Sequence, residues 1–276
     1  MVLVRVSPFD KLRVTYRQTC VKETNQVIDV VIPAHKKDLA TLEYAIDGIR
    51  RNIKDVRRII VVSKEKYTNK AEWFDEALYP FSYQEISDLV GGKNVGWNLQ
   101  QLLKLYAVLV IPNILENVLV VDADTVFYRK VSFFEEGLPL YNLCKDKDLD
   151  KMKFHIETLR HIKKIMPEIA QNLPKEYDKI SGICHHMLFQ KHVIKDLMWR
   201  IEERCGEVFY KAFLKSGETC FGVAEYNLYF YFLIACYPQN YKIRILKYKN
   251  TAKFFPFLER LRKKYDYCSY HSYMRE

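Results

Sequence analysis

The chain has 276 residues, of which 49% are hydrophobic and 14% aromatic, and it carries a formal net charge of +10. Its length suits one large α/β domain or two closely packed halves, and its apolar content is enough for a sizeable core. The longest apolar stretches, 107–115 and 229–237, are far shorter than the roughly 18 to 20 residues that cross a bilayer, which excludes a membrane helix. The N-terminus has no signal-peptide pattern, and the seven scattered cysteines form no CxxC pair. We therefore expect reduced thiols in a cytoplasmic protein.

The first half of the chain has the pattern of alternating strands and helices. A β-branched run that ends at Pro33 predicts a buried strand, 39–53 a helix, and 57–65 a second strand that ends at Ser63. This order predicts a βαβ unit with parallel strands and a right-handed crossover. A Gly91-Gly92 loop opens a second helix over 91–110, and a third apolar strand follows from 118.

The second half is richer in helical pattern. Residues 143–178 are helical in period, 181–190 resemble a strand, 191–206 a helix that ends at Gly206, and 224–237 a strongly apolar helix. The sequence contains no repeat and no Gly/Ser linker. We expect an α/β fold with a mixed, mainly parallel sheet flanked by helices in one compact domain, with two functional halves, 1–128 and 129–276.

Positive charge gathers between residues 242 and 264, which hold nine Lys or Arg and one acid, Glu259. Phe254, Phe255, Phe257 and Leu258 lie among these cations. Such a segment can bind an anionic membrane surface or nucleic acid, or it can be a solvated basic face that attracts a phosphorylated substrate.

Two aspartates, Asp122 and Asp124, end the apolar run VLVVDADTVF at 118–127. A buried charge is costly unless a cation or hydrogen bonds compensate it. Two carboxylates with one residue between them on an extended segment can face the same Mg²⁺ or Mn²⁺ ion, which readily bridges to phosphate oxygens. The pattern also fits a turn, a helix cap or the DxD of aspartate-nucleophile phosphatases. Those phosphatases usually place the motif in their first strand and carry a later acidic pair, and this chain does neither.

Several segments in order, namely DVVIPAHKKD, RRIIVVSKE, the stretch from GWNLQQLLKL to VDADTVF, SGICHHMLFQ and AEYNLYFYF, carry a family resemblance. Over roughly residues 27 to 250 the chain resembles the DUF6492 family of glycosyltransferases expected to have the GT-A fold. The stretch KLYAVLVIPNILENVLVVDADTVF is more distantly similar to glycogenin-like transferases.

The resemblance implies a role for individual residues of these segments. Asp122 would touch ribose or the metal, and Asp124 would coordinate Mn²⁺ or Mg²⁺ directly and so take part in catalysis. Lys104 would approach the diphosphate as a point charge, where glycogenin-like relatives have Arg. The nucleotide sugar would also contact Pro33, Ala34, His35, Asp38, Ser63 and Ala123.

The histidines at 185 and 186 are neighbours on an expected strand, so their side chains should face opposite ways. We assign His186 to the metal and His185 to the acceptor, with a core histidine as the alternative for either one. His271, near the C-terminus, is a weaker candidate for the metal.

Glu225 begins an apolar helix, where it is either a helix cap or the general base that removes a proton from the acceptor hydroxyl. Trp97 and Gln101 are candidates for an acceptor-binding wall and an amide contact, although Trp97 can equally pack the start of its helix.

The sequence thus predicts a metal-dependent glycosyltransferase that moves a sugar from a nucleotide diphosphate sugar, a UDP-sugar by preference, to a hydroxyl of a glycan, lipid-linked or protein acceptor. A DxD-type phosphatase or nucleotidyltransferase is the alternative. Peripheral contact with an anionic membrane is compatible with the charge distribution, and no nucleic-acid partner is expected.

Overall fold

The computed structural model describes residues 26–144, 152–173, 176–217, 222–252 and 259–271. The elements up to residue 142 are β1 (Ile28–Pro33), a 3-10 turn (Lys36–Asp38), α2 (Leu39–Asn52), β2 (Val56–Ser63), β3 (Glu72–Asp75), a 3-10 turn (Glu76–Leu78), α3 (Tyr83–Leu89), α4 (Val95–Val110), β4 (Asn117–Val121), β5 (Thr125–Phe127), β6 (Phe134–Glu135) and β7 (Leu138–Asn142). They are followed by α5 (Lys153–Ile165), α6 (Pro167–Ala170), a 3-10 turn (Tyr177–Lys179), β8 (His186–Gln190), α7 (Lys191–Cys205), α8 (Phe209–Lys215), α9 (Glu225–Cys236), β9 (Lys242–Arg244), β10 (Tyr248–Asn250), α10 (Glu259–Lys264) and β11 (Tyr267–Ser269).

The main sheet has the strand order β3-β2-β1-β4-β8 within the described chain. The first four strands are parallel, and β8 runs antiparallel to β4. In register, Val31 of β1 lies between Ile60 and Val120. This confirms the expected α/β class, with a mixed and mainly parallel sheet between helices in a single domain.

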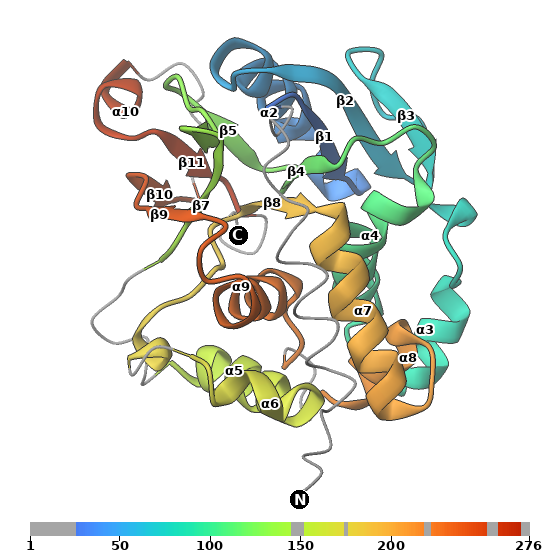
Figure 1. The fold of residues 1–276 in the computed structure, drawn as a ribbon. Coiled ribbons are helices and arrows are strands. Elements are labelled where there is room, and N and C mark those ends of the chain that lie inside the picture. The colour runs from blue at the N-terminus through green and yellow to red at the C-terminus, as the bar shows by residue number, and fades with distance from the viewer. Residues whose placement is uncertain (1–25, 145–151, 174–175, 218–221, 253–258, 272–276) are drawn as a thin grey trace, which may run out of the picture.

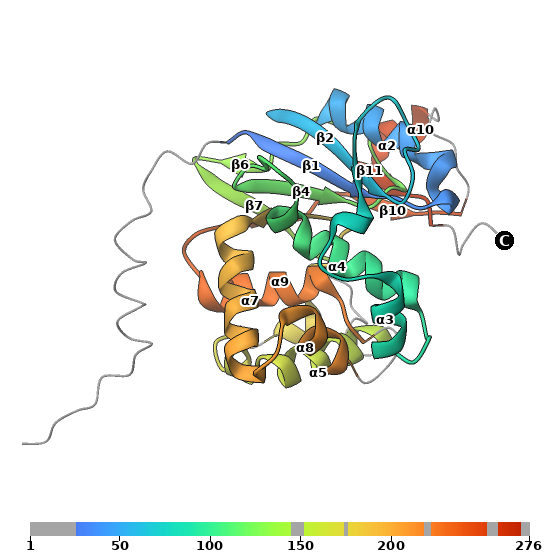
Figure 2. The ribbon, with the colours of Figure 1, turned by 90° about the vertical axis from the view of Figure 1, so that its right-hand side faces the viewer.

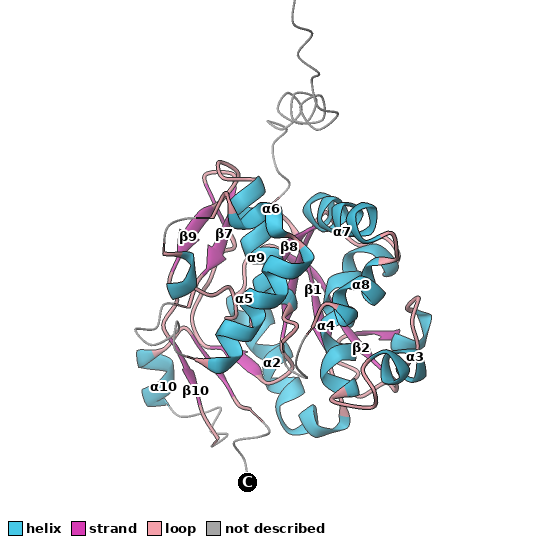
Figure 3. Ribbon diagram, turned by 90° about the horizontal axis from the view of Figure 1, so that it is seen from below, coloured by secondary structure: helices cyan, strands magenta, loops and turns pink. Residues whose placement is uncertain are grey.

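Both faces of the sheet are covered, which explains the continuous apolar runs of its central strands. Figure 2 shows α2 above the sheet and α4, α7 and α9 beneath it. A further helical layer with α5, α6 and α8 closes the lower side, as the view from below also shows (Figure 3). Every residue of α9 from Glu225 to Ala235 is buried, because this helix lies between the sheet and the lower layer.

Among the described residues, two small sheets flank the main one and bring the C-terminal part of the chain to its edge. They have the orders β10-β11-β5 and β6-β7-β9. The antiparallel pairing of β11 with β5 sets Ser269 opposite Thr125, directly after the two aspartates. The last described residues therefore lie next to the acidic pair.

Three expected elements differ from those in the structure. The strand expected at 181–190 begins only at His186, because 181–185 form an irregular segment in which His185 has a φ of 62°. The helix expected at 143–178 is interrupted after Ile165, and Pro167 starts the short α6. The basic segment 242–264 is divided between β9, β10 and α10, and its Phe254, Phe255, Phe257 and Leu258 lie outside the described residues.

Helix length and hydropathy give a negative result for membrane spanning. Among the described residues, no helix is long and apolar enough to cross a bilayer.

Candidate functional site

The acidic pair lies at the rim where the parallel strands of the main sheet end. The chain leaves β4 at Val121 and turns tightly, since the Thr125 amide donates to the Asp122 carbonyl over 3.0 Å. Because β8 is antiparallel, its beginning lies at the same rim, and the Asp122 amide donates to the His185 carbonyl over 3.0 Å. The C-terminal segment is fixed here as well, through a 2.9 Å bond from the Tyr270 amide to the Asp124 carbonyl.

A buried ammonium group joins Asp122 to the first residue of α9. Lys104 of α4 has its Nζ 2.6 Å from Asp122 Oδ1 and 2.8 Å from Glu225 Oε1, with only 4% of its side chain exposed. Tyr226 completes the group: its hydroxyl donates to Asp122 Oδ1 over 3.1 Å, and its ring centroid lies 4.2 Å from the Lys104 Nζ. We call these four side chains the lysine cluster.

Burial and mutual attraction oppose each other in this cluster, and the balance differs between its members. Burial by itself lowers the pKa of Lys104, but the two carboxylates outweigh it and raise that pKa above the ordinary value. For Asp122, burial is outweighed by Lys104 and His185, which hold its pKa well below the usual range. For Glu225, burial prevails over Lys104 and raises the pKa. Asp122 is thus kept ionised at the rim.

Two imidazoles stand beside the aspartates. His271 Nδ1 lies 3.2 Å from Asp124 Oδ2, and His185 Nδ1 lies 3.5 Å from Asp122 Oδ2. The two rings are neighbours, with centroids 4.6 Å apart. The rim therefore gathers two carboxylates and two imidazoles, which are ligand types that Mn²⁺ accepts.

The fit of a divalent ion depends on Asp124. Its Oδ1 is buried and has no hydrogen-bond partner among the described residues, which is costly for a carboxylate oxygen unless a cation or substrate reaches it. Within the same residues, no three His, Cys, Asp or Glu side chains already form a metal-binding group. A site in which phosphate oxygens supply most ligands needs only one or two carboxylates, so these residues fit an ion that arrives with a diphosphate.

The assignment of His186 to the metal is not supported by its surroundings. Its Nε2 contacts the Asn142 side chain, and its ring packs against the rings of Phe127, Phe133 and Tyr267. Burial lowers its pKa to about 3, which is the behaviour of a neutral core histidine. The strand begins at His186, five residues later than expected, and His185 just before it is the member of the pair that reaches the rim.

Glu225 and Gln101 also have other roles than those expected from the sequence. The Glu225 side chain is only 3% exposed and is bound to Lys104. A general base must be within hydrogen-bond reach of the acceptor hydroxyl, and this enclosed carboxylate is not open to one. Gln101 is buried, and its Oε1 accepts from the Glu225 amide over 3.3 Å. Both residues fix the start of α9 rather than line an open acceptor site.

Lys104 itself differs from the expectation of a direct diphosphate contact. Its ammonium is enclosed by Asp122, Glu225 and the ring of Tyr226. Its positive charge therefore acts at the rim through Asp122. Sequence reasoning missed Tyr226 altogether, because a tyrosine on an apolar helix carries no signal of its own.

The remaining expected contacts divide between the rim and the interior. Pro33 ends β1 at the rim and Ala34 follows it, His35 is exposed, and the Asp38 carboxylate accepts from the His35 amide over 3.0 Å. The pKa of Asp38 is raised, chiefly by burial and in part by the negative charge of Asp124. The two carboxylates are therefore close enough to repel each other. Ala123, between the two aspartates, is buried.

Two further expected contacts turn inward. Ser63 is buried, and its hydroxyl donates to the Glu65 carbonyl over 2.7 Å. Trp97 is half-buried with its ring edge-on to Phe154, which is the packing role foreseen as its alternative. The Ser63 hydroxyl is therefore not presented to a ligand at the rim.

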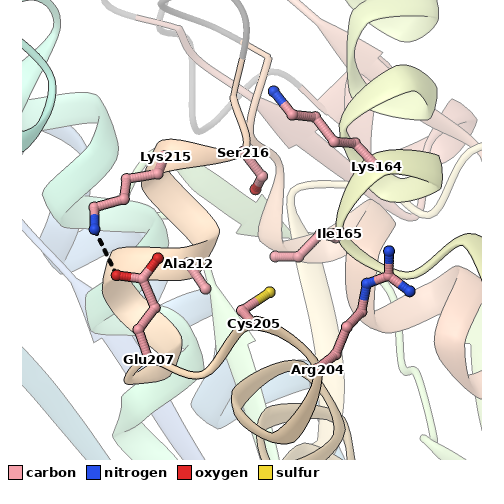
Figure 4. A pocket seen from close by; sticks show the side chains of 8 residues that line it. All are labelled: Lys164, Ile165, Arg204, Cys205, Glu207, Ala212, Lys215 and Ser216. Carbon is pink, nitrogen blue, oxygen red and sulfur yellow. Dashed lines mark hydrogen bonds and ion pairs between the residues drawn. The ribbon is translucent and has the colours of Figure 1, made fainter.

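A cavity of about 550 Å³ lies elsewhere, between α5, α7 and α8 (Figure 4). Lys164, Arg204 and Lys215 line it, and Lys215 Nζ is 2.6 Å from the Glu207 carboxylate. The C-terminal ends of α7 and α8 border this cavity, and helix C-termini disfavour anions. It contains none of the residues expected at the site, and we assign no function to it.

No protein-family model and no curated protein sequence matches this chain. Among solved structures, the apo form of mouse xyloside xylosyltransferase 1 is similar, with a TM-score of 0.45 and 8% sequence identity. The similarity covers 88% of this chain and 96% of that chain.

Proposed function

We propose that this chain is a glycosyltransferase that uses a nucleotide diphosphate sugar, preferably a UDP-sugar, and transfers the sugar to a hydroxyl acceptor with the help of Mn²⁺ or Mg²⁺. One observation carries the proposal. Asp122 and Asp124 stand at the carboxyl end of a central parallel strand, and a buried Asp124 oxygen has no hydrogen-bond partner among the described residues. The carboxyl ends of the strands are where open α/β sheets bind nucleotides.

The residues around the acidic pair keep Asp122 ionised and orient the two carboxylates. Lys104 and Tyr226 keep Asp122 ionised and fixed in direction, while the His271 ring orients Asp124. When bound at these carboxylates, a divalent ion supplies Lewis-acid stabilisation of the departing diphosphate. His185 stands beside Asp122 at the rim and is placed to hydrogen-bond a sugar or phosphate oxygen.

Binding can be tested first by thermal shift, with UDP, MnCl₂ or both added to the full chain. We expect the melting temperature to rise more with both than with either alone, because a ligand that binds only the native state stabilises it. Asp124→Asn should remove this synergy. Asp88→Asn, which changes an exposed aspartate on α3, should retain it.

Turnover is tested by release of the leaving group from a panel of nucleotide sugars. The proposal predicts nucleoside diphosphate as the product and a loss of about a hundredfold or more in Asp124→Asn, since metal stabilisation of the transition state is worth several kcal/mol. Release of inorganic phosphate alone would favour the phosphatase alternative. A fully active Asp124→Asn variant would exclude the proposed site.

A further inference from the structure

Contacts of the main chain and of basic side chains bring three distant stretches together on one side of the molecule. The Arg129 guanidinium donates to the Arg262 carbonyl over 3.2 Å and also to the carbonyl of Lys263, at the end of α10. The neighbouring Lys130 donates to the carbonyl of Arg51, at the end of α2. Figure 1 shows α10 and α2 in the upper part of the molecule, with β5 between them.

The packing beneath these contacts sets which side chains face outward. Leu261 of α10, Tyr44 of α2 and Tyr265 pack against a small buried cluster that contains Val126 and Tyr128. The apolar side of α10 is thereby used inside the protein. Its cationic side chains, Arg260, Arg262, Lys263 and Lys264, are exposed, as are Arg51, Lys54 and Lys130.

The charge of this surface is strongly one-sided. Residues 51–55, 129–130 and 259–266 hold eight Lys or Arg against three acids, Asp55, Glu259 and Asp266, a formal excess of five positive charges. We call these three stretches the basic face. Lys242 and Arg244 of the sequence run 242–264 do not join it, because Lys242 binds Glu135 and Glu136, and Arg244 binds Asn142.

We propose that the basic face docks on an anionic lipid bilayer. Clusters of roughly four to eight basic residues attract anionic headgroups, and a bilayer offers a continuous plane that cations from three separate stretches can meet together. In Figures 1 and 3, β9 and β10 lie on the same side of the molecule as α10. The adjoining segment exposes Ile243 and Ile245, and such apolar side chains suit the headgroup boundary better than a nucleic acid backbone.

Docking would also fix the rim relative to the membrane surface, because α10 leads directly into β11 and His271. The inference does not rest on the proposed transferase activity. The basic face contains none of the rim residues, and its binding is measured without turnover.

The experiment is flotation of the full chain with vesicles of phosphatidylcholine alone or with about 30% phosphatidylglycerol. We expect binding to the anionic vesicles only, with a steep loss between 50 and 300 mM NaCl, because salt screens surface charge. The variant Arg262→Gln/Lys263→Gln/Lys264→Gln should bind at least tenfold more weakly. Their side chains are exposed, and the contacts from Arg129 use main-chain carbonyls that the variant keeps.

The matched control is Lys153→Gln/Arg160→Gln/Lys163→Gln, which removes the same charge from exposed positions of α5, on the opposite side of the molecule in Figure 1. It should bind like the parent chain. Equal loss in both variants, no binding to anionic vesicles, or preferential binding to duplex RNA or DNA would overturn the proposal.

Discussion

At the scale of single residues, the Lys104 ammonium compensates the negative charges of Asp122 and Glu225. Lys104→Met removes the cation and leaves Glu225, 3% exposed, as an unpaired buried carboxylate. Breaking a buried ion pair in this way costs about 3–5 kcal/mol. We expect that loss in urea unfolding at pH 8, and we expect Lys104→Met/Glu225→Gln to recover most of it.

The pH dependence of the same variant provides its control. The pKa of Glu225 is already raised by burial, and loss of Lys104 raises it further. An acid with a raised folded-state pKa stabilises the fold at low pH and loses that contribution as pH rises through it. The difference in the free energy of unfolding between the parent chain and Lys104→Met should therefore become smaller from pH 8 to pH 6. A difference that stays constant would contradict a charge effect.

At the scale of elements, the close crossing of segment 181–185 over α9 depends on Gly182. A Cβ placed there would lie 2.4 Å from the Phe230 Cβ and 3.1 Å from the Tyr226 carbonyl. The crossing is fixed by Asn227, whose Oδ1 accepts from the Gly182 amide over 2.8 Å. We expect Gly182→Ala to lower the free energy of unfolding by about 1–3 kcal/mol through overpacking, as measured by urea denaturation.

Gly96, in the first turn of α4, is the matched control. A Cβ there meets nothing within 4 Å, so Gly96→Ala should be neutral or stabilising by up to about 1 kcal/mol through helix propensity. Equal effects of the two substitutions would show that the crossing at Gly182 is not tight.

Elements whose pattern is local were predictable from the sequence. The strand that ends at Pro33, the helix that follows it, and the helix ended by Gly206 match β1, α2 and α7, because burial on both faces, amphipathic period and a left-handed C-cap each leave a local signature. The start of β8 was not predictable. It depends on His185 adopting a positive φ and on Asn227 holding the preceding segment, which are tertiary conditions.

The site was predictable where one short motif defines it, and not where distant segments meet. Asp122 and Asp124 end an apolar strand at the rim as expected. The contact of His271 with Asp124 spans 147 positions and depends on the pairing of β11 with β5, which the sequence pattern does not reveal. The enclosure of Glu225 by Lys104 spans 121 positions and is equally invisible to spacing.

At the scale of the whole molecule, stability depends on two buried histidines in different layers. His161 of α5 lies in the lower helical layer, and His186 is the first residue of β8 in the main sheet. Burial lowers the pKa of His161 to about 4 and that of His186 to about 3. Each ring is therefore neutral in the folded protein at pH values where an exposed histidine is charged.

Because the histidine pKa values are lower in the folded than in the unfolded chain, the free energy of unfolding decreases as the pH falls over a defined range. The unfolded chain protonates each histidine near pH 6.5, and the folded chain does not, so the stability contribution is complete above 6.5 and is lost as pH falls towards 4 and 3. Each histidine gives a slope approaching about 1.4 kcal/mol per pH unit, and the two together about twice that. Glu225, with its raised pKa, opposes this loss in part as pH falls.

The slope is measured by urea unfolding between pH 7.5 and pH 5, above the range in which Asp122 and its lowered pKa contribute. His161→Gln and His186→Gln should each remove about 1.4 kcal/mol per pH unit from the slope below pH 6. The slope of the free energy of unfolding against pH depends only on the number of protons taken up on unfolding. It therefore measures the contribution of the histidine even where the substitution also weakens packing. If both variants kept the slope of the parent chain, these histidines would already be protonated in the fold, and His186 could no longer be assigned to the neutral core behind the rim.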